Sequence, residues 1–216
     1  MAQLITGLDA GRIRDNLARI RANLERIRAE LPATTEILAA VKYVPLEEIG
    51  TLAAAGVTLA GENRAQDLEA KATAHPRLRW HFIGQLQSRK VKQILPLVEL
   101  IHSVASDSAL AQLERHAPPG TQILVEVNVA GEDAKAGIAP GDLGDFIARA
   151  AVDVVGLMGM PPFAEDPEQS RPHFAALREL AREHGLRHLS MGTSQDYAVA
   201  VEEGATIVRL GSVLFD

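Results

Sequence analysis

Short apolar runs rich in β-branched residues alternate with helix-like stretches along nearly all of this 216-residue chain. Several runs are continuously apolar, which is typical of parallel strands covered on both faces. The eight candidate strands are Ile37–Tyr43, Thr58–Gly61, Trp80–Gly84, Leu100–Ala105, Gln122–Val129, Val154–Met160, His188–Gly192 and Thr206–Gly211. The candidate helices between them are Leu46–Ala55, Arg64–Ala74, Ser88–Leu97, Ala109–His116, Asp142–Ala151, Pro167–His184 and Ser194–Glu203.

This repeated alternation predicts an α/β fold, a single (β/α)8 TIM barrel. The eighth strand is followed by so few residues that we expect no helix after it. A doubly wound open sheet is the alternative, although it usually has fewer strands. An extra amphipathic helix, roughly Asp9 to Glu30, precedes the first strand, and we expect it to cover the gap beside the eighth. We find no linker or low-complexity segment, so residues 1–216 form one predicted domain.

The composition excludes several classes of function. The net charge is −6 and there is no basic cluster, so neither nucleic acid nor an anionic membrane is an expected partner. The chain has no cysteine, which excludes disulfides, thiolate catalysis and zinc–thiolate sites. No signal peptide and no apolar window of about 18 residues is present. We therefore expect a soluble cytoplasmic protein.

The active face of such a barrel lies at the carboxyl ends of its strands. The residues found there include one lysine, one arginine, amides, and hydroxyl side chains beside glycines. They include no carboxylate pair, histidine cluster or Ser-His-Asp set, and we expect no metal site. The strand-end residues are Lys42, Tyr43, Glu62, Asn63, Gly84, Gln85, Ser103, Ser106, Asn128, Met158, Met160, Gly192, Thr193, Ser194, Arg209, Gly211 and Ser212.

Glycines and hydroxyls after the last two strands are suited to binding a phosphate. Backbone N–H groups at Gly192 and Gly211 are approachable, and Ser194 is predicted to lie at a helix N-terminus, which favours anions. A partly buried lysine has a lowered pKa, and its neutral amine can form a Schiff base with an aldehyde, so we expect Lys42 to serve as such an amine. Pyridoxal 5'-phosphate combines both demands. Arg209 would donate to an unprotonated ring nitrogen, which weakens the ring as an electron sink.

Each of these residues also has a simpler interpretation. Lys42 resembles a strand-end lysine that extends to solvent, and Gly192 and Gly211 resemble ordinary turn glycines. Ser194 is equally suited to capping a helix, and Arg209 to a buried ion pair. Residues 62–63 are equally suited to capping the next helix. His184 and His188 are four residues apart, but Gly185 ends the helix between them, so we do not interpret them as metal ligands.

Several long motifs, in order and at consistent spacing, resemble one known family over nearly the whole chain. They are AVKYVP around Lys42, GENRAQ at Gly61–Gln66, WHFIGQLQSRKVK at Trp80–Lys92, EVNVAGEDAKAG at Glu126–Gly137, GLMGMPP at Gly156–Pro162 and LSMGTSQDYAVAVEEGATIVRLGSVLF at Leu189–Phe215. On these motifs the chain resembles the YggS/PROSC family of pyridoxal phosphate homeostasis proteins. It departs from the usual pattern at Arg89, where Asn is common, and at Thr193, where Met is common.

The resemblance implies a barrel like the N-terminal domain of alanine racemase, with pyridoxal phosphate on Lys42. It places the phosphate near Ser194, Gly211 and Ser212, and Arg209 beside the ring nitrogen; we add Asn63 to this cofactor-binding set. Family members regulate vitamin B6 balance without an established turnover, so we expect a monomeric non-enzyme that supplies apo-enzymes dependent on the cofactor. The alternatives are a racemase-like enzyme, which would need a second acid/base, and a barrel that binds another phosphorylated metabolite non-covalently.

Overall fold

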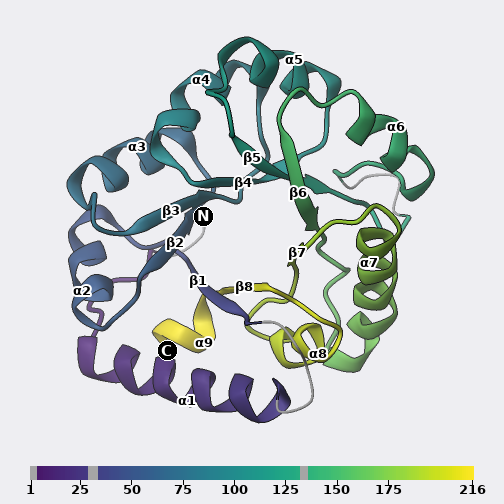
Figure 1. The fold of residues 1–216 in the computed structure, drawn as a ribbon. Helices are drawn as coiled ribbons and strands as arrows, with labels where there is room; N and C mark the ends of the chain where they lie inside the picture. The colour runs from purple at the N-terminus through teal and green to yellow at the C-terminus, as the bar shows by residue number, and fades with distance from the viewer. Residues whose placement is uncertain (1–3, 29–33, 132–135) are drawn as a thin grey trace.

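The computed structural model describes residues 4–28, 34–131 and 136–216, in which eight parallel strands close into a barrel in sequence order (Figure 1). The predicted (β/α)8 barrel is confirmed, and the open-sheet alternative is wrong. The strands are β1 (Glu36–Ala40), β2 (Leu59–Glu62), β3 (Arg79–Phe82), β4 (Leu100–Val104), β5 (Gln122–Glu126), β6 (Asp153–Met158), β7 (His188–Ser190) and β8 (Ile207–Leu210).

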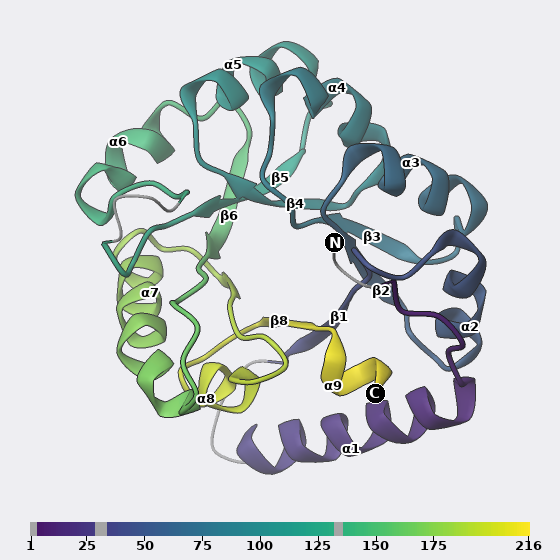
Figure 2. The same cartoon turned by 180° about the vertical axis from the view of Figure 1, so that it is seen from behind.

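Helices surround this barrel on all sides, as the view from behind also shows (Figure 2). No helix within the described ranges is long and apolar enough to cross a membrane. The α-helices are α1 (Ala10–Arg28), α2 (Ile49–Ala54), α3 (Ala65–Ala74), α4 (Val91–Ile94), α5 (Asp107–His116), α6 (Leu143–Ala148), α7 (Arg171–Glu183), α8 (Tyr197–Glu202) and α9 (Ser212–Phe215). Short 3-10 turns are η1 (Leu46–Glu48), η2 (Ser88–Lys90), η3 (Leu95–Leu97), η4 (Pro140–Asp142) and η5 (Pro167–Ser170).

Most strands end earlier than the apolar runs predict. The run Ile37–Tyr43 forms a ladder only to Ala40, and His188–Gly192 only to Ser190. Just past these points single backbone hydrogen bonds still reach the neighbouring strands, from the Val41 N–H to the Gly61 carbonyl at 2.9 Å and from the Met191 N–H to the Ile207 carbonyl at 3.1 Å, before the chain enters the loops of the barrel mouth. As a consequence, the strand-end residues of the predicted site stand on loops just past the strands.

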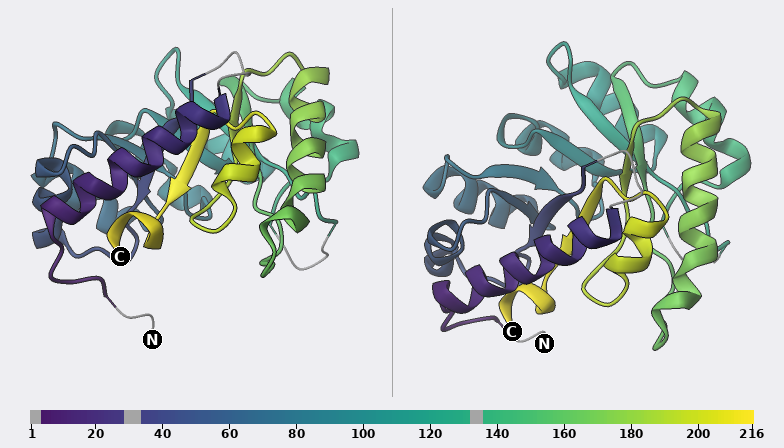
Figure 3. Two further views of the ribbon diagram at one scale, coloured as in Figure 1. Left: turned by 90° about the horizontal axis from the view of Figure 1, so that it is seen from below. Right: turned by 60° about the horizontal axis from the view of Figure 1, so that its bottom comes forward.

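The N-terminal helix α1 lies beside α8, α9 and α2, across the outside of β1 and β8 (Figure 3). Its buried face carries Ile13, Leu17, Ile20 and Leu24, as its helical spacing predicts. The Asn16 side chain donates to the Leu214 carbonyl at 3.2 Å. The expectation of no helix after the eighth strand is wrong, because the one-turn helix α9 forms there and packs under α1.

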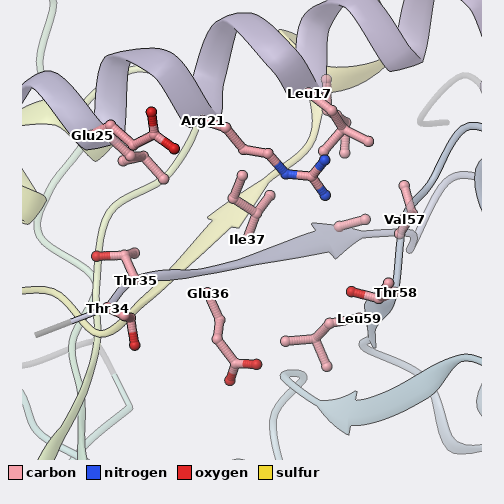
Figure 4. Close-up of a pocket in the computed structure, with 13 residues that line it drawn as sticks. Leu17, Arg21, Glu25, Thr34, Thr35, Glu36, Ile37, Val57, Thr58 and Leu59 are labelled. Atoms are coloured by element: carbon pink, nitrogen blue, oxygen red, sulfur yellow. The ribbon is translucent and has the colours of Figure 1, made fainter.

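A cavity of about 300 Å³ remains between α1 and the strands that it covers (Figure 4). Leu17 lines it from the helix, and Ile37 and Val57 from the opposite side, with Arg21 and Glu25 also on its wall. None of the predicted cofactor-binding residues lines this cavity. We therefore interpret it as a gap in the packing of α1 and place the candidate site elsewhere.

The interior of the barrel has an apolar layer beneath a polar one. Side chains alternate between the two faces of each strand, so residues two apart share the inward face. The apolar layer is one buried cluster that contains Leu38, Leu59, Leu100, Leu124, Val155, Met158 and Ile207. Two residues beyond three of these positions the inward side chains are polar, namely His102, Glu126 and Arg209. Leu38 is followed on the inward face by Ala40 and then, just past the end of β1, by Lys42.

Glu62 does not face the mouth, because it lies on the outward side of β2. Its carboxylate is fully buried and accepts from the backbone N–H groups of Asn63 and Arg64 at 2.6 and 3.2 Å. The other carboxylate oxygen pairs with the buried Lys71 ammonium of α3 at 2.5 Å. Lys71 also donates to the Val41 carbonyl at 2.9 Å, immediately before Lys42. This ion pair therefore ties α3 to the loop that carries the candidate lysine.

We predict that Lys71→Met lowers the free energy of unfolding by about 3–5 kcal/mol, because the buried Glu62 charge loses its partner. The exposed Lys92 of α4 has no ion pair among the described residues, so Lys92→Met is the matched control. It should change stability by less than about 0.5 kcal/mol. Chemical denaturation measures both, and equal losses in the two variants would contradict the assigned role of the buried pair.

Candidate functional site

A cavity of about 600 Å³ lies at the barrel mouth, at the carboxyl ends of β1, β7 and β8. It brings together five of the predicted cofactor-binding residues. Asn63 is not among them: it lines a separate cavity of about 210 Å³ with Arg64 and Arg89, and its buried Oδ1 has no hydrogen-bond partner among the described residues. The mouth cavity is lined by Ile5, Ala40, Lys42, Tyr43, Thr193, Ser194, Gln195, Arg209, Gly211, Ser212 and Asp216.

Lys42 stands in a turn two residues beyond the end of β1, on its inward face. The expectation of a partly buried lysine is wrong, since its side chain is exposed. Its ammonium nitrogen lies 4.6 Å from the centroid of the Tyr43 ring, a cation–π contact. The wide mouth explains the exposure, and it leaves the amine accessible to a ligand in the cavity.

The loop after β7 depends on Gly192, whose φ is +90°. A Cβ at this position would lie 2.6 Å from the Ala200 Cβ, so α8 approaches the loop too closely for a side chain. The next residue, Thr193, begins the turn into α8, and its carbonyl accepts from the Tyr197 N–H at 2.9 Å. The Asp196 carboxylate accepts from the Thr193 N–H at 2.7 Å and from its hydroxyl at 3.0 Å, so the Thr193 hydroxyl is already paired within the loop.

Ser194 does not lie at the start of α8, which begins at Tyr197. Instead its hydroxyl oxygen accepts from the N–H groups of Gly211 and Val213 at 3.0 and 3.3 Å, at the start of α9. Two backbone donors from the loop after β8 thus converge on one oxygen. A Cβ at Gly211 would meet only the Ala40 carbonyl, at 4.0 Å, so the loop is open on that side. This arrangement fits the oxygens of a phosphate.

Arg209 extends inward from β8 and is only 7% exposed. Its Nη1 donates to the carbonyl and the hydroxyl of Ser190, both at 2.7 Å, and its Nη2 donates to the Gly159 carbonyl at 3.1 Å. Burial lowers the pKa of Arg209 to about 10, while the charges of Asp196 and Glu126 oppose that shift. Among the described residues it forms no ion pair, contrary to the simpler interpretation of the sequence.

Arg209 has hydrogen-bond donors that its contacts within the protein do not use. A guanidinium has five N–H donors, and the contacts above use three of them. The Nε–H and the second Nη2–H have no acceptor among the described residues. Because Arg209 also lines the mouth cavity, these donors are suited to an acceptor atom on a ligand held there.

Three further residues of this region were not predicted from the sequence: Ser190, His102 and His81. They connect to Arg209 through hydrogen bonds across the barrel interior. The sequence did contain a signal for the two histidines: His81 interrupts the apolar run RWHFIG, and His102 interrupts LIHSVA. Both side chains fall on the inward face of their strands. Within the described residues, no group of three or more histidines or carboxylates is arranged to hold a metal ion.

Glu126 was also missed. It lies on the inward face of β5 and lines a neighbouring cavity of about 430 Å³, which shares Thr193 and Gln195 with the mouth. Burial raises the pKa of this carboxyl, and the charge of Arg209 acts against that shift. The mouth therefore contains positive charge at Lys42 and Arg209, with one half-buried carboxylate nearby.

The barrel and its mouth define the class of proteins built on the N-terminal domain of alanine racemase. The model of that family, described as the alanine racemase N-terminal domain, matches residues 16–216.

Comparison with individual proteins narrows this class. A pyridoxal phosphate homeostasis protein of Aquifex aeolicus is 43% identical over 83% of this chain and 86% of its own. A solved structure of PipY from Synechococcus elongatus, with PLP bound, is 31% identical, with a TM-score of 0.79 over 94% of this chain and all of that one. A solved structure of an unknown protein from Bifidobacterium adolescentis is 31% identical, with a TM-score of 0.85 over 99% and 98% of the two chains. This chain belongs to the family of pyridoxal phosphate homeostasis proteins.

We predict that Gly192→Ala lowers the free energy of unfolding more than Gly204→Ala does. The φ angle is +90° at Gly192 and +95° at Gly204, a region that L-residues rarely adopt, so both variants incur about 1–2 kcal/mol of backbone strain. Only Gly192 has a neighbour within clash distance, which adds about 1–3 kcal/mol. Chemical denaturation of the two variants measures the difference, and equal destabilisation would contradict the close approach of α8.

Proposed function

We propose that this chain binds pyridoxal 5'-phosphate, holds it as a Schiff base on Lys42, and acts in homeostasis of the cofactor without catalytic turnover. The observation that carries the proposal is that Lys42, Arg209 and the Ser194–Gly211 contact share one cavity. The name of the Aquifex relative and the PLP-bound structure of PipY support it.

The residues of the mouth divide the binding of the cofactor among them. Lys42 would supply the amine, and the cofactor, when bound, would supply an aldehyde group. The N–H groups of Gly211 and Val213 donate to the Ser194 hydroxyl in this structure, and a phosphate oxygen would take the place of that hydroxyl oxygen after the Ser194 side chain rotates to donate to the phosphate. Ser212 lies at the same turn. The two unused donors of Arg209 would face the ring nitrogen. Asn63 stays a proposed contact, from the rim of its own cavity.

Arg209 is also the reason to propose carriage of the cofactor over turnover. A guanidinium donates hydrogen bonds and does not accept them, so the ring nitrogen beside it would stay unprotonated. An unprotonated pyridine withdraws electrons weakly, and removal of an α-proton from a bound amino acid would gain little stabilisation. This argument disfavours the racemase-like alternative.

The proposal also covers the domain organisation, the oligomeric state, the recipients of the cofactor and the cellular compartment. We propose that residues 1–216 act as a single cofactor-binding barrel domain and as a monomer. The recipients of the cofactor would be apo-enzymes that depend on it, in the cytoplasm. Non-covalent binding of another phosphorylated metabolite is the competing interpretation, and the first experiment below distinguishes the two.

We predict that borohydride reduction of the protein mixed with pyridoxal phosphate leaves a phosphopyridoxyl group on the Lys42 peptide. Peptide mass spectrometry locates the adduct. Lys42→Ala should abolish it at this peptide, whereas Lys92→Ala, at an exposed lysine outside the mouth, should leave it unchanged. A folded protein with no adduct on Lys42 would leave non-covalent phosphate binding as the better interpretation.

We also predict that the protein loaded with pyridoxal phosphate exchanges the α-protons of amino acids in deuterated water no faster than free cofactor does. The physical reason is the weak electron sink imposed by Arg209. Proton NMR of a panel of amino acids measures the exchange. Sustained exchange by the pure protein, lost in Lys42→Ala, would contradict this prediction and favour the racemase-like enzyme.

A further inference from the structure

A line of hydrogen-bonding side chains crosses the inside of the barrel from β8 to β3. The Arg209 Nη1 donates to the Ser190 hydroxyl at 2.7 Å, and that hydroxyl lies 2.8 Å from the Nδ1 of His102. The Nε2 of His102 lies 2.9 Å from the Nδ1 of His81. Each of these four residues is on a different strand: β8, β7, β4 and β3. The line therefore joins strands on opposite sides of the barrel.

All four residues are removed from solvent. The exposed fractions are 0% for Ser190 and His102, 2% for His81 and 7% for Arg209. Burial lowers the pKa of His81 to about 3, and the charges of Arg79 and His188 add to the shift. Burial also lowers the pKa of His102 well below its usual value, with His81, Arg209 and His188 acting in the same direction. Both imidazoles are neutral near pH 7.

The direction of the hydrogen bonds follows from the chemistry of the end member. A guanidinium only donates, so Ser190 accepts from Arg209, and among the described residues the Nδ1 of His102 is the one acceptor within reach of the Ser190 hydroxyl proton. The Nδ1 of His102 then accepts, and in a neutral imidazole the proton must be on Nε2. That Nε2–H donates to the Nδ1 of His81, whose own proton is likewise on Nε2. One arrangement of protons satisfies the whole line.

We propose that Ser190, His102 and His81 form a positioning relay that holds Arg209 in place, with every hydrogen bond pointing from Arg209 toward His81. The inference rests on the proposed function, in which Arg209 faces the ring nitrogen of the cofactor. Without the relay, Arg209 keeps only two carbonyl acceptors, those of Ser190 and Gly159. The relay fixes which guanidinium N–H groups remain available to the cavity.

The relay also accounts for an arginine in this place instead of a lysine. Three acceptors in fixed directions match the planar fork of a guanidinium, and an ammonium has neither the reach nor the geometry to replace it. Ser190 is the key member, because it alone contacts both Arg209 and a histidine. Arg209 lines the mouth cavity and the three relay residues do not, so they would act through Arg209.

The first test uses the unmutated protein without cofactor. Long-range nitrogen–proton NMR should show His81 and His102 as single Nε2–H tautomers that do not titrate between about pH 5 and 8. In Ser190→Ala the donor to His102 is lost, and the second tautomer of the histidine pair should become populated. A protonated Nδ1 on His102 in the unmutated protein would overturn the proposed direction, whatever the variants do.

The second test asks whether the relay acts on the ring nitrogen through Arg209. Affinity is measured for pyridoxal phosphate and for an analogue in which a C–H replaces the ring nitrogen. The preference for pyridoxal phosphate should fall about threefold to tenfold in Ser190→Ala, because a charge-assisted hydrogen bond is misaligned. Ser190→Thr, which keeps the hydroxyl, should restore the preference.

Ser103→Ala is the matched control. Ser103 is also a buried serine of the barrel, 3% exposed, and its hydroxyl donates to the Gly84 carbonyl outside the relay. It should leave both the tautomers and the preference unchanged. An equal loss of affinity for both ligands in Ser190→Ala would indicate a merely structural role and overturn the proposal. Absence of the Lys42 adduct in the unmutated protein is a separate outcome, which removes the proposed function itself.

Discussion

The inward faces of the strands change from apolar to polar at one height in the barrel, and the rest of the site depends on this change. The leucine-rich cluster below fills the interior, so the buried polar groups above it must find partners within the protein. His102 and Arg209 face inward because residues two apart on a strand share a face, and Lys42 continues the inward row of β1 in the turn just past its end. The mouth thus has an apolar floor with polar groups directly above it.

Among the residues that the structure describes, the buried cations Lys71 and Arg209 are held in contrasting ways. Lys71 lies outside the barrel and is neutralised by a carboxylate, so its role is to fasten α3 and the chain before Lys42. Arg209 lies inside and is held by carbonyls and a hydroxyl, which leaves its charge uncompensated by any described contact. The uncompensated charge of Arg209, next to an open cavity, is suited to binding an electron-rich ligand. The neutralised charge of Lys71 is suited to a structural role.

Much of the site was predictable because it depends on local order along the chain. The eight apolar runs predict the barrel, and the carboxyl ends of the strands predict Lys42, Ser194 and Arg209 as neighbours. The predictions that failed concern contacts between segments that are distant in the sequence. The sequence does not show that Glu62 faces α3, that Ser194 caps α9 and not α8, or that Lys42 is exposed. The relay was missed for the same reason, since its members lie on four strands.

The position of α1 has a consequence for how the chain reaches this structure. During synthesis α1 is made before the barrel strands, yet α8 and α9, which pack against it, come after seven of those strands: the bond from Asn16 to Leu214 joins residues 198 apart. The helix must therefore wait for the rest of the barrel before it can dock. On the ribosome its apolar face stays uncovered for most of translation, which makes this segment a natural client for a chaperone that binds nascent chains.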